Sequence, residues 1–267
     1  NAASSRTLTL DGTGGIIVSG NISNSFAGST GNIAIAANAS NVTLSGNNSY
    51  NGTTTLTGGG AMNINSANAI STNTFTIGTS SFLNNTSGGA ITNLGNNNIT
   101  LADTLTFGTS GSTAANSLNL GTGTVTASSS RTITIAGTDV TLGLGTLDST
   151  STSSGRTFTA NGEGNTLSLA GWKIQSGSTA NVTAKLAGTA NWTITGPIVN
   201  GNAFSNGVQI DATGLTTFGG NNTYDGTTVV SSGATLRITS ATGLGSTNTG
   251  TTVEVGGQLQ MSGGITV

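Results

Sequence analysis

The sequence has no cysteine, no histidine and a single proline in 267 residues. Without cysteine there can be no disulfide crosslink, and without histidine or cysteine most nucleophilic catalysis and most zinc sites are excluded. One proline suits a chain made of strands, because proline cannot donate a ladder hydrogen bond. Pro197, which follows Gly196, is expected at the start of a strand.

Charge is also scarce. Lysine and arginine total 6 residues and aspartate and glutamate total 8, so the net charge is −2 and no basic stripe for nucleic acid is present. The sequence contains no run of about 18 apolar residues, which is the length that would predict a transmembrane helix. Asn1 to Arg6 lack the apolar core of a signal peptide. The sequence indicates mature or excised material. The lack of cysteine is compatible with export, because a chain that crosses two bacterial membranes unfolded gains nothing from early disulfides.

Glycine supplies 43 residues, and threonine, asparagine and serine dominate the remainder. This composition resembles that of disordered chains, but short segments alternate apolar and polar residues, which is the period of a strand with one buried and one solvated face. We therefore predict an all-β fold with almost no helix. Its inward pairs include Leu8 and Leu10, Phe75 and Ile77, Ile99 and Leu101, Leu105 and Phe107, Leu118 and Leu120, Ile133 and Ile135, Leu167 and Leu169, Val253 and Val255, Leu259 and Met261, and Ile265 and Val267.

The chain also repeats itself. The segment that contains Gly46-Asn-Asn-x-Tyr-x-Gly-Thr-Thr54 recurs near the other end of the chain, with the same residue types at Gly220 to Thr228. An internal repeat of this kind favours a repeat architecture over a globular one. The positions that the two copies share, and that we expect to be structural, are Asn47, Asn48, Tyr50 and Gly52 in one copy and Asn221, Asn222, Tyr224 and Gly226 in the other.

This motif resembles the passenger-associated β-strand repeat of bacterial autotransporters. The resemblance covers residues 47–64 and 221–238, and it implies a right-handed parallel β-helix, or β-solenoid. No membrane-barrel translocator is present, and residues 118–192 contain no full copy. We predict one continuous solenoid over residues 1–267, with repeat-like stretches at 18–91 and 195–265, that is part of a longer protein.

Candidate chemistry is sparse. No two of the eight acidic residues lie close together in sequence, so we predict no catalytic site, no metal site and no cofactor. Asp11-Gly12 begins the nearest approach to a calcium-binding turn, but that segment does not repeat. The acidic residues, which we expect in solvated turns, are Asp11, Asp103, Asp139, Asp148, Glu163, Asp211, Asp225 and Glu254.

One short region differs from the rest. Both tryptophans and both lysines of the chain, at Trp172, Lys173, Lys185 and Trp192, lie in the part that lacks the repeat. Aromatic faces beside polar groups suit carbohydrate, so these residues are the candidate ligand patch. The alternative is that the tryptophans fill the core where the coil changes shape.

Threonine pairs of the form Thr-x-Thr suggest a further alternative. Stacked on one flat face they would make an ice-binding array, but their spacing along this chain is irregular, which argues against that arrangement. The pairs are Thr7 and Thr9, Thr74 and Thr76, Thr132 and Thr134, and Thr157 and Thr159.

The leading functional hypothesis is a secreted structural or adhesive rod at the bacterial cell surface, with surface glycans or matrix components as partners. A second hypothesis is a subunit of an extracellular matrix or biofilm filament, in which like subunits stack end to end by β-strand pairing. A third is a β-helix that binds or degrades polysaccharide. We expect no enzymatic activity and no nucleic-acid partner.

Overall fold

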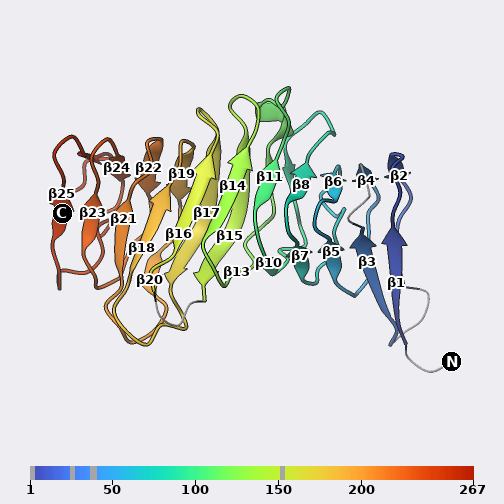
Figure 1. The fold of residues 1–267 in the computed structure, drawn as a ribbon, viewed down its shortest axis with the longest axis horizontal. Coiled ribbons are helices and arrows are strands. Elements are labelled where there is room, and N and C mark those ends of the chain that lie inside the picture. The colour runs from blue at the N-terminus through green and yellow to red at the C-terminus, as the bar shows by residue number, and fades with distance from the viewer. Residues whose placement is uncertain (1–3, 25–27, 37–40, 151–153) are drawn as a thin grey trace.

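A computed structural model describes residues 4–24, 28–36, 41–150 and 154–267. The chain is all-β, and parallel strands stack as a solenoid of about ten turns (Figure 1). The described residues contain one helical element, the short 3₁₀ turn η1 (Ala114–Asn116). The predicted fold class, an all-β parallel solenoid, is confirmed.

The strands of the described residues belong to two hydrogen-bonded sheets. The 15-stranded sheet contains β1 (Ser5–Leu10), β3 (Thr30–Ile35), β5 (Thr54–Leu56), β7 (Phe75–Ile77), β9 (Ile91–Thr92), β10 (Ile99–Leu101), β12 (Leu118–Asn119), β13 (Val125–Ala127), β15 (Thr141–Ser149), β17 (Thr166–Ile174), β19 (Asn191–Ile194), β20 (Ile198–Asn200), β22 (Leu215–Phe218), β24 (Thr235–Ile238) and β26 (Gln258–Met261). The 11-stranded sheet contains β2 (Ile16–Val18), β4 (Val42–Leu44), β6 (Ala61–Ile64), β8 (Ser81–Asn84), β11 (Leu105–Phe107), β14 (Arg131–Ile135), β16 (Thr157–Asn161), β18 (Thr183–Ala187), β21 (Gly207–Ile210), β23 (Thr228–Val230) and β25 (Thr251–Val253).

The 15-stranded sheet consists of two ladders that share the long strands β15 and β17. Ladder 1 runs through β1, β3, β5, β7, β10 and β13 to the second halves of β15 and β17 and then to β20. Ladder 3 runs from β9 and β12 through the first halves of β15 and β17 to β19, β22, β24 and β26. The 11-stranded sheet is ladder 2, so a full coil has three sides.

Inward side chains form the core. The predicted pair Phe75 and Ile77 is buried, and the same holds for the predicted pairs from Ile99 to Leu169. The outermost coils have a neighbouring coil on one side only, so their side chains keep access to solvent. At these two ends the prediction is wrong for several residues, which are exposed: Leu8, Val253, Val255, Met261 and Val267. Pro197 directly precedes β20, close to the strand start predicted for it.

Coil length varies, and the corners absorb the variation. In ladder 2, Leu44 pairs with Ile64 of the next coil, whereas Phe107 pairs with Ile135, so the second of these coils contains more residues. The strands stay in register because the extra residues form longer turns, such as the one that contains η1. Irregular spacing in the sequence therefore coexists with regular stacking in space.

Candidate functional site

The repeat motif forms corners in which a buried asparagine ties three coils together. The Asn48 side chain accepts a hydrogen bond from the Ile22 backbone N–H (2.8 Å) and donates one to the Ala69 carbonyl (2.6 Å). Ile22 lies in the preceding coil and Ala69 in the following one. A buried amide with both ends paired in this way satisfies backbone groups that the corner takes out of the ladder.

The second copy repeats this geometry. Asn222 accepts from the Ile198 N–H (2.8 Å) and donates to the Gly243 carbonyl (2.7 Å). The asparagines that precede these two, Asn47 and Asn221, are exposed and accept hydrogen bonds from side chains of the next coil. The motif therefore contributes one buried and one exposed link between coils.

A tyrosine follows each buried asparagine and points inward. The Tyr50 hydroxyl lies 2.5 Å from the Thr54 hydroxyl, and the Tyr224 hydroxyl lies 2.5 Å from the Thr228 hydroxyl. Burial favours the neutral phenol, which raises the pKa of Tyr50 and raises the pKa of Tyr224 to about 12. Neither ring is accessible to a ligand, because Tyr50 and Tyr224 are fully buried.

The motif glycines lie where a coil approaches its neighbour too closely for a side chain. A Cβ atom at Gly52 would lie 2.3 Å from the Gly31 carbonyl oxygen, and one at Gly226 would lie 2.3 Å from the Asn206 carbonyl carbon. All the motif positions thus take part in coil-to-coil packing.

The two copies of the motif lie on different sides of the solenoid. In the first copy β4 and β6 belong to ladder 2 and β5 to ladder 1, whereas in the second copy β22 and β24 belong to ladder 3 and β23 to ladder 2. The motif is therefore a local corner unit that occurs at two different positions around the axis.

The candidate ligand patch is not an aromatic surface. Trp172 and Trp192 point into the core and are 0% and 1% exposed. The Trp172 ring packs edge-to-face on Phe158, with ring centroids 6.2 Å apart, and the Trp192 indole N–H donates to the Ala187 carbonyl (3.1 Å). The patch hypothesis is wrong for the tryptophans, because each occupies an inward position of its strand.

The two lysines point outward but do not share a surface. Lys173 lies in ladder 1 and its ammonium is 3.4 Å from an Asp148 carboxylate oxygen, whereas Lys185 lies in ladder 2 and is 3.5 Å from Asp211. Ion pairs as exposed as these contribute little stability. The four predicted patch residues therefore do not converge on one ligand.

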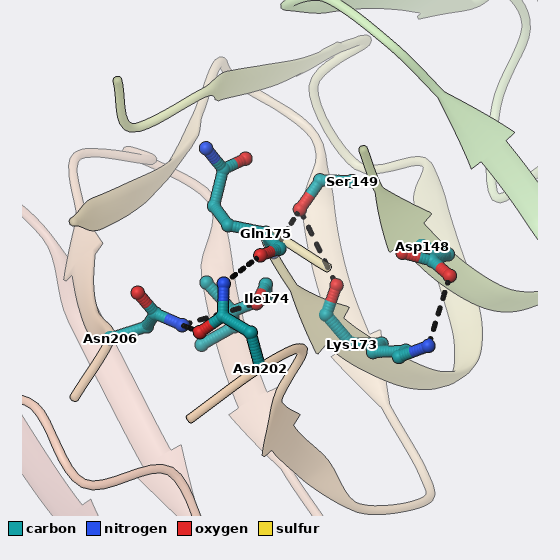
Figure 2. A network of polar contacts seen from close by, with 7 residues as sticks. All are labelled: Asp148, Ser149, Lys173, Ile174, Gln175, Asn202 and Asn206. Carbon is teal, nitrogen blue, oxygen red and sulfur yellow. Dashed lines mark hydrogen bonds and ion pairs between the residues drawn. The ribbon is translucent and has the colours of Figure 1, made fainter. Parts of the chain in front are cut away.

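A polar network lies at the corner beyond β17 (Figure 2). The Gln175 N–H donates to the Ser149 hydroxyl (2.9 Å), and the Asn202 amide donates to the Gln175 carbonyl (2.7 Å) and accepts from Asn206 (3.2 Å). These bonds link successive coils where Gln175 takes a positive φ of 53°. Within the described residues no group of three His, Cys, Asp or Glu side chains is placed to hold a metal ion.

A surface depression lies over β6 and β8 and extends to the residues that follow β11, and sequence analysis missed it. Phe82 is 49% exposed at an outward position of β8. Asn63 and Asn84, which are register partners in β6 and β8, also line the depression. The sequence could have predicted this exposed ring, because Ser81 and Leu83 on either side of Phe82 are in the inward phase of a period-2 strand. Among the described residues, the others that line the depression are Asn41, Gly59, Ala61, Met62, Leu83, Gly108 and Thr109, none of which is charged.

The fold and its corners define a β-solenoid repeat protein. The chain has no significant match to a family model, to a curated protein or to a solved structure. Among the described residues no helix is long and apolar enough to span a membrane.

Proposed function

We propose that this chain is a section of an extracellular rod at the surface of a bacterium, in which the solenoid supplies stiffness and its uncharged polar surface supplies adhesive contacts. One observation supports the proposal above all: in the described part of the chain, ladder 2 continues in parallel register through eleven strands, from β2 to β25. A structure built by stacking alone resists bending, because each interior coil is bonded to the coils on both sides of it.

The adhesive part of the proposal is supported by the depression around Phe82. An exposed aromatic ring next to amide groups offers a stacking face and hydrogen-bonding groups to a sugar ring. The Asn63 amide already donates to Thr43 (2.8 Å), and Asn84 accepts from the Asn85 N–H (2.9 Å). Within the described chain, the Asn84 amide N–H groups have no protein partner and are free to donate to a ligand. A neutral glycan of the surroundings is the partner that this uncharged lining fits best.

The resemblance of the two motif segments to the passenger-associated repeat supports the bacterial-surface part of the proposal. Immuno-electron microscopy of the producing cells tests it. Straight rods attached to the cell surface are expected. Regular fibres found away from the cells would indicate a matrix filament of stacked subunits instead of a surface rod. Label confined to the cell interior would overturn the proposal.

A further inference from the structure

Outward threonines of ladder 1 form two ranks across four successive coils. The central rank takes one residue from the middle of each of β5, β7, β10 and β13, and consecutive members are register partners: Thr55, Thr76, Thr100 and Thr126. The flanking rank takes the residue two positions earlier in each coil: Thr53, Thr74, Asn98 and Thr124. Seven of the eight positions are threonine.

We propose that this face, the threonine face, binds ice. Stacked coils repeat about every 4.8 Å and alternate residues of a strand are about 6.6 Å apart, so the threonines form a two-dimensional lattice of hydroxyl and methyl groups. Such a lattice holds a layer of water at spacings close to those of the water molecules on an ice surface. Ice binding by this face does not depend on the proposed location of the chain at the bacterial surface.

The hydroxyl groups of the central rank are available to water. Within the described part of the chain none of these four hydroxyls has a hydrogen-bond partner in the protein. Exposed threonines in corners behave differently: the Thr86 hydroxyl bonds to Asn65 and the Thr122 hydroxyl bonds to Asn96. In the flanking rank the Thr53 hydroxyl likewise donates to Asn32 (3.3 Å). These bonded hydroxyls stabilise the fold, whereas those of the central rank keep their bonding capacity for an external layer.

The array is rigid before it meets a ligand. Threonine is branched at Cβ and has few χ1 rotamers, and each central threonine has another threonine above or below it in register. Thr76 is half-buried by these neighbours although it points outward. A surface that is already ordered loses little entropy when it orders water, which favours binding.

Strand propensity alone does not explain the two ranks. Ladder 2 has outward positions of the same kind, but its register runs from Phe82 through Thr106 and Thr134 to Asn161, without a run of four threonines. The threonine face also lacks charge, because β5, β7, β10 and β13 contain no ionisable residue. The first charged residue beyond the central rank is Asp148 of β15, the register partner of Thr126.

The Thr-x-Thr pairs are irregularly spaced along the sequence, yet those on the threonine face are regularly spaced. Corners of different length bring Thr76 into register with Thr55 and Thr100 of the neighbouring coils. The fold also separates the pairs by ladder. Thr132 and Thr134 lie on ladder 2, away from the threonine face.

Thermal hysteresis of the purified chain tests the proposal. The wild-type chain is expected to depress the freezing point below the melting point by a gap that grows with protein concentration. Thr100→Tyr places a bulky ring at an exposed position in the middle of the face and is expected to remove most of the gap. Thr134→Tyr is the matched control at an outward strand position of ladder 2, and it is expected to keep the wild-type gap.

A second variant, Thr76→Val, keeps the shape of threonine and removes one hydroxyl, and it is expected to reduce the gap while leaving the circular dichroism spectrum and Tm close to wild type. A wild-type chain without hysteresis would overturn the proposal, and so would equal losses in Thr100→Tyr and Thr134→Tyr. Neither result would alter the rod proposal, which depends on the cell-surface images.

Discussion

Asn48 and Asn222 make the same two hydrogen bonds to the coils before and after them, although the strands that flank them belong to different ladders. The sequence of the corner therefore decides its own geometry, and its position around the solenoid axis does not matter. This local independence explains how two copies in distant parts of the chain can share a conformation without sharing a side of the solenoid.

Replacing the buried asparagine tests the role of the corner. Asn222→Ala leaves the Ile198 N–H and the Gly243 carbonyl without their partner inside the protein, so we expect a loss of about 2 to 4 kcal/mol in the free energy of unfolding. Urea unfolding followed by circular dichroism measures this loss. The neighbouring Asn221→Ala, at an exposed position, is the control and should cost less than about 1 kcal/mol. Equal losses in the two variants would contradict the assigned role.

The two buried tyrosines should differ in how much their hydroxyl groups contribute. In Tyr50→Phe, the buried Thr54 hydroxyl loses its one side-chain partner among the described residues, so we expect a loss of about 1 to 3 kcal/mol in unfolding free energy. In Tyr224→Phe, Thr228 keeps its bond to the Leu244 carbonyl, and about 0.5 to 1.5 kcal/mol is expected. A larger loss for Tyr224→Phe would reverse this ranking. The comparison uses the same urea unfolding measurement on both variants.

Stability should fall at alkaline pH. The pKa of Tyr224 is about 12 in the folded chain, against about 10 for an unfolded tyrosine, so between these values the unfolded state has released a proton that the folded state keeps. The contribution of this tyrosine is complete below about pH 10 and declines above it by about 1.4 kcal/mol per pH unit until about pH 12. The raised pKa of Tyr50 acts in the same direction.

Urea midpoints measured from about pH 8 to pH 12 check this dependence, with tyrosinate absorbance as the titration signal. Tyr224→Phe removes one ionisable group, so its stability should decline less steeply over the same range. An identical decline in the variant and the wild type would show that Tyr224 does not cause it.

Close coil contact at the motif glycines gives a further test. Gly52→Ala places a methyl group 2.3 Å from a backbone oxygen of the preceding coil, and we expect it to destabilise the chain by about 1 to 3 kcal/mol. Gly14→Ala meets no atom within 4 Å, so it should leave the unfolding free energy within about 0.5 kcal/mol of wild type. Thermal unfolding by calorimetry compares the two. If Gly52→Ala were as stable as wild type, the two neighbouring corners would be able to move apart at little cost in free energy.

The depression around Phe82 can be tested by glycan binding. A glycan array first identifies a neutral oligosaccharide that the wild-type chain binds. Phe82→Ala removes the exposed ring, and we expect its affinity for that oligosaccharide to be about tenfold lower, which is a change of about 1.4 kcal/mol in binding free energy. Leu94→Ala is the control, because Leu94 is also a large exposed apolar residue but lies outside the depression. Unchanged binding in Phe82→Ala would place the adhesive surface elsewhere.

Sequence alone predicted the strands well and the candidate ligand patch badly. Alternation correctly assigned Phe75 and Ile77 to the core, because a side chain in a strand points to the opposite face from its neighbour. The same alternation could have placed Trp192 inward and Phe82 outward. Composition suggested a tryptophan patch instead, and burial excludes it. Whether a residue is inward or outward in its strand predicted its exposure better than the rarity of its residue type in the chain did.

The inward and outward phase of a strand and the conformation of the repeated corner depend on residues close together in the chain, so both can be predicted from the sequence. Which strands stack on which depends on contacts between distant coils, so it is known only from the folded chain. Thr76 and Thr100 become register partners because the turns between them take up the whole intervening length of chain, and nothing local to either threonine specifies that length. Register between coils follows from the burial of all the inward residues together, so the surfaces that coils build jointly can be found only in the assembled solenoid.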